Sequence, residues 1–222
     1  MDEKVIVNEN DGVQNIKLDN KDLKKVYNRW YFTTELSNSY DRLQGLAFCN
    51  ALSKALKKLY ATDEKAYIDA LKRHMEFYNS EGTAGCLIHG IALSMEEKKA
   101  NGVPVPGEVI TGIKTGLMGP IAGIGDTIIW GTAKAIILAL GCTFALQGNI
   151  IGAFIPFLFP LLGYMLGWLF LKFGYRVGKD AVMKLMKSGM INTIITGASI
   201  MGLFMMGALS SSYVSVSTSL TF

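Results

Sequence analysis

The sequence contains two long stretches without a single charged residue. They cover residues 135–171 and 188–222 and are 37 and 35 residues long. A membrane-spanning helix needs about 20 apolar residues, so each stretch is long enough to cross a bilayer. The alternative, two buried helices of a soluble enzyme, is rare in a chain of 222 residues. The sequence therefore predicts an all-α integral membrane protein.

The first uncharged stretch is too long for a single span. A Gln-Gly-Asn sequence at 147–149 interrupts it and predicts a turn. We therefore expect a helical hairpin with arms at about 127–146 and 150–171. The second stretch contains a third candidate span at 190–209. Residues 210–222 are polar and β-prone, so we expect a tail there and about three spans in total.

The charged residues are unevenly distributed. Residues 1–114 hold 16 acidic and 16 basic residues, whereas only two acidic and six basic residues follow them. Five of those six lie between 172 and 187, which predicts a local basic loop and not a nucleic-acid-binding domain. Basic loops stay in the cytoplasm. We therefore expect this loop and the N-terminal half inside the cell, and the 147–149 turn and the 210–222 tail outside.

The N-terminal half has the pattern of amphipathic helices. Residues 1–22 are polar and lack the apolar core of a signal peptide, so we expect a mobile tail in which 5–7 favour a short strand. Residues 23–115 carry apolar side chains at three- and four-residue steps, typical of helices in the cytoplasm or against the membrane. Thr62 is the expected cap of one helix. Another, at 84–99, is almost fully apolar up to Met95, ends in a charged run at 96–99 and is stopped by the glycine and prolines that follow it.

The cysteines and histidines suggest no metal site. Cys49, Cys86 and Cys142 lack the spacing of a zinc site, so we expect reduced thiols. His89 lies in an apolar helix and is expected to be packed and hydrogen-bonded. His74 lies near the end of an amphipathic helix, where it is either a cation at the helix terminus or a docking contact.

Residues 116–131 read GLMGPIAGIGDTIIWG and hold five glycines and Pro120. A regular helix is unfavourable here, because each glycine costs about 1 kcal/mol and a proline about 3 kcal/mol. At membrane depth such segments are usually broken or re-entrant, and protein or water then satisfies the freed backbone groups. We expect a break of this kind within a membrane domain that covers 116–209.

Two ionisable residues, Asp126 and Lys134, flank this expected break. Together with Trp130 they form a ladder at four-residue steps on one helix face. Charges inside a membrane are costly and are usually functional or paired. Two interpretations remain open. Asp126 caps a helix that starts at Thr127 while Lys134 is paired or reaches the interface, or the ladder contacts a substrate.

Five segments of the sequence resemble one known family. The strongest is GLMGPIAGIGDTIIWGT at 116–132, and YDRLQG at 40–45 and LKRHMEFYN at 71–79 match in the same order. ALG followed by QGNI at 139–150 and GYRVG at 174–178 complete the set. The chain resembles the IID components of the mannose/fructose/sorbose-family phosphotransferase systems (PTS) from about residue 30 to about residue 207.

The resemblance implies a role in sugar import. Together with a IIC subunit, a IID subunit moves a hexose such as mannose through the bacterial cytoplasmic membrane, and the IIA and IIB phosphocarriers supply the phosphate. The resemblance implies a multi-pass subunit with its N-terminus in the cytoplasm, in a hetero-oligomer with several IIC and IID copies. It also implies no catalytic residue and no cofactor in this chain.

The resemblance and the ladder together suggest candidate site residues. The candidates on the cytoplasmic side, where IIB must approach, are His74, Glu76 and Asn79. The candidates for contact with the sugar are Gly123, Gly125, Asp126, Thr127, Trp130 and Lys134.

Two features depart from the family pattern. The family's asparagine element continues with Thr, any residue and Pro, whereas Asn79 is followed by Ser80, Glu81 and Gly82, so Ser80 and Glu81 receive no expected role. Family members also carry a further hydrophobic C-terminal segment, so we expect either a C-terminally truncated product or a missing part that is supplied elsewhere. The alternative functions are a non-catalytic membrane scaffold or receptor subunit and a secondary transporter that works alone.

Overall fold

The computed structural model describes the backbone of residues 16–188 and the side chains of residues 16–178. The expected strand at 5–7, the third span at 190–209 and the tail at 210–222 lie outside the described residues. The described part is helical, with two isolated β-bridges. Its elements are α1 (Asn20–Thr33), α2 (Gly45–Leu59), α3 (Glu64–His74), α4 (Cys86–Ala100), α5 (Gly107–Gly125), the π-helix η1 (Asp126–Lys134), α6 (Ala135–Leu146), α7 (Ile151–Phe154), the 3₁₀ turn η2 (Ile155–Phe157) and α8 (Leu158–Ser188).

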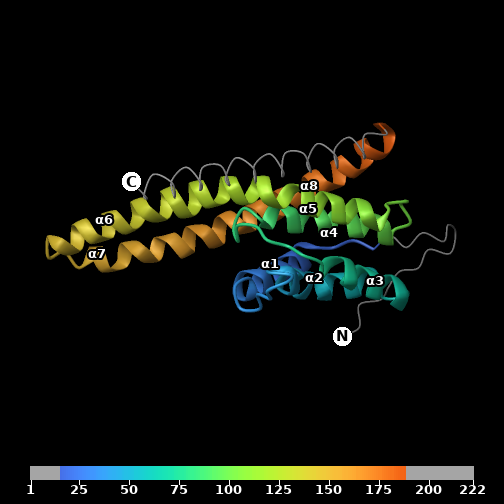
Figure 1. Ribbon diagram of the computed structural model, residues 1–222, viewed down its shortest axis with the longest axis horizontal. Helices are drawn as coiled ribbons and strands as arrows, with labels where there is room; N and C mark the ends of the chain where they lie inside the picture. Colours follow the sequence, from blue (N-terminus) through green and yellow to red (C-terminus); the bar gives the residue numbers. More distant parts are fainter. Residues whose placement is uncertain (1–15, 189–222) are drawn as a thin grey trace, which may run out of the picture.

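A long hairpin dominates the shape of the molecule (Figure 1). Its first arm is one continuous helix from Gly107 to Leu146, and its second runs from Ile151 through Gly178. Both arms are long and apolar enough to cross a membrane. Gly148 occupies the turn with a φ of 74°, a conformation that favours glycine. The predicted hairpin and its turn are confirmed, but the first arm begins about twenty residues before the predicted 127.

The glycine-rich segment is neither broken nor re-entrant, which corrects that expectation. Residues up to Gly125 are α-helical with Pro120 inside the helix, and a π-helix follows without interruption. At Gly125 the propensity cost is partly offset, because the missing side chain permits close packing. A Cβ on Gly125 would lie 2.7 Å from the Cβ of Glu81. Within the π-helix, the Thr132 hydroxyl donates 2.9 Å to the Thr127 carbonyl, so that backbone group keeps a partner.

The first helix starts earlier than the sequence suggested. Leu18 is buried, and its N–H donates 2.8 Å to Glu97. Asp19 caps α1 through a reciprocal pair of bonds with Asp22. Residues 16–22 are therefore not part of a mobile tail. The cap of α3 is Asp63, which accepts from the N–H of Ala66, and not the expected Thr62.

The second arm lies against α4 through a row of glycines. A Cβ on Gly90 of α4 would stand 2.2 Å from the Leu171 carbonyl, and one on Gly174 would stand 2.1 Å from the Leu87 carbonyl. The two backbones therefore touch. The expected basic loop at 172–187 is also wrong, because α8 continues through Ser188. Packing of buried Leu171 and Tyr175 in the core keeps this segment helical.

Candidate substrate cleft and buried polar network

A cleft of about 610 Å³ opens where the N-terminal helices meet the hairpin. Its described lining residues include three carboxylates, those of Glu35, Glu81 and Asp126, and no lysine or arginine. Aromatic rings supply much of its wall. The lining residues are Tyr27, Tyr31, Thr34, Glu35, Gln44, Asn79, Ser80, Glu81, Gly82, Thr83, Ala122, Asp126, Trp130, Phe159, Pro160 and Gly163.

Glu81 is the most buried carboxylate of this cleft, with 4% of the residue exposed. It accepts hydrogen bonds from the N–H groups of Thr83 and Ala84 at 2.9 and 2.5 Å, just before α4 begins. It also accepts a bond of 3.1 Å from the indole of Trp130 on the hairpin. Sequence reasoning gave Glu81 no role, and no local pattern marks it, because its partner lies in a distant segment.

Trp130 lies between the two arms of the hairpin. Its ring meets Phe159 edge-on with centroids 5.8 Å apart, and the Lys134 ammonium stands 4.3 Å from its centroid. This cation–π contact gives the Lys134 charge an internal partner. Within residues 16–178 no ion pair joins Asp126 to Lys134. The capping interpretation of Asp126 is also wrong, because Asp126 continues a helix and has helical backbone angles.

The other candidates on the hairpin have different surroundings. Gly125 is buried against Glu81. Thr127 is exposed, and its hydroxyl donates 2.8 Å to the carbonyl of Gly123, so it is engaged within its own helix. Of the six hairpin candidates, Asp126 and Trp130 line the cleft. Asn79, the candidate for the IIB side, also lines it.

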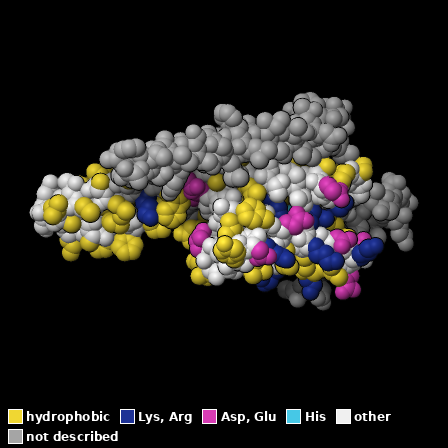
Figure 2. All heavy atoms as spheres, viewed as in Figure 1, with side chains coloured by type: hydrophobic (Ala, Val, Ile, Leu, Met, Phe, Trp, Pro, Cys, Tyr) yellow, Lys and Arg dark blue, Asp and Glu magenta, His cyan; other side chains and the backbone are white. Residues whose placement is uncertain are grey.

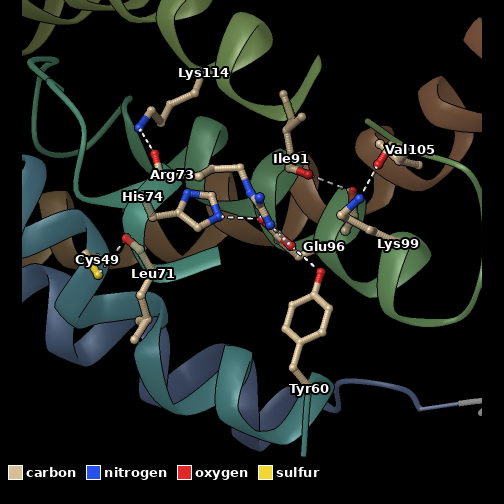
Figure 3. A network of polar contacts seen from close by, with 11 residues as sticks. Cys49, Tyr60, Leu71, Arg73, His74, Ile91, Glu96, Lys99, Val105 and Lys114 are labelled. Atoms are coloured by element: carbon tan, nitrogen blue, oxygen red, sulfur yellow. Dashed lines mark hydrogen bonds and ion pairs between the residues drawn. The ribbon is translucent and has the colours of Figure 1, made fainter. Parts of the chain in front are cut away.

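His74 belongs to a buried polar network and not to the surface (Figure 3). The network centres on Glu96, which is 0% exposed. His74 Nε2 lies 2.8 Å from Glu96 Oε1, and Arg73 donates through Nε and Nη2 at 2.8 and 3.1 Å. Tyr60 adds a bond of 2.5 Å. The Lys114 ammonium closes the network by donating 2.9 Å to the Arg73 carbonyl.

Burial and bonding decide the charges in this network. Burial lowers the pKa of His74, more than its bond to Glu96 raises it. Neutral His74 thus donates through Nε2, and its Nδ1 has no partner among the described residues. Burial by itself raises the pKa of Glu96, but the bonds from His74 and Arg73 outweigh it and lower that pKa to about 2. The expected docking role of His74 does not fit a side chain without exposed surface, whereas Glu76 is exposed.

His89 is packed and hydrogen-bonded, as the sequence suggested. Its Nδ1 lies 3.0 Å from the Gly85 carbonyl, and its ring lies 4.1 and 4.0 Å from the rings of Trp30 and Phe48. Burial lowers its pKa to about 3, so it is neutral at physiological pH. Both histidines of the chain are therefore enclosed, without exposed surface.

The fold and the surface define a helical integral membrane protein. Large apolar side chains stay exposed along both arms of the hairpin, whereas a soluble protein would bury such side chains. Figure 2 shows some of them on the surface of the hairpin. The family model for the PTS mannose/fructose/sorbose family IID component matches residues 17–222. This chain belongs to that family of IID components.

Similar proteins include IID components named for different sugars. The chain is 40% identical to the mannose-specific component of Escherichia coli K12, over 77% of this chain and 60% of that one. It is 37% identical to the sorbose-specific component of Klebsiella pneumoniae, over 84% and 68%. The chain thus spans about 60% of the length of the Escherichia coli relative.

The fold also matches a solved structure. The cryo-EM structure of the mannose transporter ManYZ with microcin E492 contains a chain that is 38% identical, with a TM-score of 0.80. The match covers 87% of this chain and 70% of that chain. A second structure, described as a membrane protein, matches with a TM-score of 0.64 at 36% identity, over 87% of this chain and 71% of that one.

Proposed function

We propose that this chain is the IID subunit of a PTS sugar permease in the bacterial cytoplasmic membrane. With a IIC subunit it moves a hexose such as mannose inward, and a IIB subunit phosphorylates the sugar. The observation that carries the proposal is the cleft between Asp126, Trp130 and the segment 79–83. This cleft contains both hydrogen-bond acceptors and aromatic rings, and it lies at the base of an apolar hairpin.

The chemistry of this cleft suits a neutral polyol. Carboxylates at Asp126 and Glu35 accept hydrogen bonds from hydroxyls, and the amide of Asn79 can both donate and accept. The aromatic faces of Trp130 and Tyr31 pack against the apolar face of a sugar ring. Because the described lining residues include no cationic side chain, a sugar phosphate is disfavoured, which fits a subunit that handles the sugar before phosphorylation.

The two histidines support a subunit that carries no phosphate itself. The family resemblance implies that phosphate passes to histidines on the IIA and IIB units. His74 and His89 are both 0% exposed, and no other histidine exists in the chain. The phosphate relay therefore belongs to the IIA and IIB partners in this proposal.

The proposed orientation places the hairpin tip outside and the N-terminus inside. Charge supports it, because the uncharged second arm ends at Lys172 and Arg176, far from the tip. Single cysteines test it in a background where exposed Cys142 is replaced by serine. In intact cells, Gly148→Cys should react with an impermeant thiol reagent and Lys179→Cys should not. The reverse labelling would contradict this orientation.

Uptake of labelled mannose tests the function itself. The chain is expressed with its IIC, IIA and IIB partners, and Asp126→Asn is compared with Asp69→Asn, a matched change on the exposed face of α3. Loss of a charge-assisted hydrogen bond costs about 1.5–3 kcal/mol, so Asp126→Asn should lower uptake by about tenfold or more while the complex still assembles. Normal uptake would exclude the sugar contact. No uptake by the unchanged complex, for any hexose tried, would favour the scaffold function.

A further inference from the structure

A second cavity lies on the N-terminal helices, apart from the substrate cleft. It is a groove of about 410 Å³ between α1 and α2. Its floor is apolar and consists of Val26, Ala51 and Ala55, which are buried. Five cationic side chains and one carboxylate surround this floor. They are Lys25, Arg29, Lys54, Lys57, Lys58 and Asp22.

Among the described residues, the positive charge of this groove is largely uncompensated. Its one carboxylate, Asp22, already pairs with Lys58 at 2.7 Å. Lys25, Lys54 and Lys57 are exposed, and within residues 16–178 none of them has a carboxylate within ion-pair distance. The groove therefore attracts an anion.

Arg29 is held in place by neutral groups. Its Nη1 donates 3.1 Å to the Asn50 carbonyl and 2.9 Å to the Ser53 hydroxyl. Because these acceptors carry no charge, the guanidinium is oriented but not neutralised. An oriented guanidinium is well suited to phosphate, since its N–H groups match two phosphate oxygens.

Contacts with α8 fix the level of the groove along the hairpin. The Tyr27 hydroxyl donates 2.5 Å to the Tyr164 carbonyl, and the Tyr175 hydroxyl donates 3.4 Å to the Leu18 carbonyl. Helix α1 thus runs antiparallel to α8, with residues 18–27 beside 164–175. The groove residues of α1, 22–29, therefore lie beside the last turns of the uncharged arm, which ends at Leu171. If the arm spans the bilayer, the groove lies at the inner edge of the apolar layer, within reach of the lipid headgroups.

We propose that the groove between α1 and α2 binds the phosphate headgroup of an anionic phospholipid, such as phosphatidylglycerol. Arg29 and the three unpaired lysines hold the phosphate, and the apolar floor contacts the glycerol and the first methylenes of the acyl chains. The inference depends on the proposed membrane orientation but not on sugar transport. The apolar floor of the groove and its position near the membrane interface favour a lipid as the occupant. An acidic protein surface would require neither of these features.

Binding of short-chain lipids to the purified IIC–IID complex tests this proposal. The probes are dihexanoyl phosphatidylglycerol, dihexanoyl phosphatidylcholine and inorganic phosphate, followed by native mass spectrometry. The groove variant combines Lys25→Gln, Lys54→Gln and Lys57→Gln. The matched control combines Lys24→Gln, Lys65→Gln and Lys72→Gln, which are exposed and lie outside the groove.

The complex should bind phosphatidylglycerol in preference to phosphatidylcholine and to phosphate. Each basic side chain near an anionic lipid is worth about a factor of five in affinity, so the groove variant should lose roughly a hundredfold and the control little. Equal binding by both variants would overturn the proposal. So would a groove variant that keeps the lipid but loses IIB, which would identify an acidic protein as the occupant. Sugar uptake is measured separately, so a failed lipid test and a failed transport test are distinguishable.

The variants should remain folded, because the substituted lysines are exposed. If the triple variant does not assemble with IIC, the single charge reversal Lys54→Glu serves instead. It should weaken binding of phosphatidylglycerol by more than the reversal Lys65→Glu does. Equal affinities of these two variants would also overturn the proposal.

Discussion

The indole N–H of Trp130 donates a hydrogen bond of 3.1 Å to the buried carboxylate of Glu81. This bond joins the first arm of the hairpin to the segment that precedes α4. It also closes one side of the proposed sugar cleft, which both residues line.

Replacing the indole with a ring that cannot donate isolates this bond. Trp130→Phe keeps an aromatic ring against Phe159 but leaves Glu81 with one donor fewer. A buried acceptor that loses a partner costs about 1–3 kcal/mol, so thermal unfolding of the complex should begin at a lower temperature. Trp168→Phe is the control, because the described structure gives that indole N–H no hydrogen bond. Equal melting of the two variants would show that the bond contributes nothing.

The buried network should be more sensitive to substitution than any exposed carboxylate. Glu96→Gln removes the charge that Arg73, His74 and Tyr60 share, and it places an amide donor among donors. Breaking a buried pair in this way costs about 3–5 kcal/mol. Glu76→Gln on the surface should change the free energy of unfolding by less than about 0.5 kcal/mol. Denaturant unfolding of the complex measures both values, and similar values would contradict the described network.

A Gly→Ala substitution should destabilise the protein at the contact between α4 and α8 and stabilise it at a glycine that faces open space. Gly90→Ala and Gly174→Ala each drive a methyl group into backbone of the facing helix, at 2.2 and 2.1 Å, so the helices must separate. We expect a loss of at least about 2 kcal/mol, or failure to assemble. Gly119→Ala has open space and should stabilise α5 by up to about 1 kcal/mol. The melting temperatures of the three variants test this prediction. An unchanged melting temperature for Gly90→Ala would exclude the close contact between the backbones of α4 and α8.

Acid should destabilise the chain through its histidines before it affects the Glu96 carboxylate. Burial lowers the pKa of both His74 and His89 in the folded state, the latter to about 3. The unfolded chain therefore binds more protons below about pH 6.5, and stability falls there by up to about 1.4 kcal/mol per pH unit for each histidine. The depressed pKa of Glu96 acts only below about pH 4.5.

Melting between pH 7 and pH 5 measures this histidine contribution separately. His89→Leu removes one of the two groups, so its melting temperature should depend less steeply on pH than that of the unchanged complex. The quantity compared is the change in melting temperature per pH unit, so a difference in the overall stability of the variant does not affect the comparison. An unchanged slope would mean that His89 takes up its proton in the folded state.

The membrane class, the hairpin and its turn could be predicted from the sequence because they depend on local properties. An uncharged stretch of 37 residues and a glycine at the turn act through lipid and through backbone angles, whatever the rest of the chain does. The family was also recognisable, since its motifs are continuous segments. Asp126 and Trp130 are four residues apart, so they lie on one face of a helix, and this places both of them in the same cleft.

The roles of His74, Glu81 and the glycine-rich segment were decided only by the tertiary structure. His74 lies at the end of an amphipathic helix, and only α4 brings Glu96, 22 positions away, over it and buries both. Glu81 meets Trp130 across 49 positions. The glycines at 116–131 predicted a break because propensity counts only the cost within one helix. At Gly125, close packing against the side chain of Glu81 offsets part of that cost, and the sequence of the segment alone does not contain this partner.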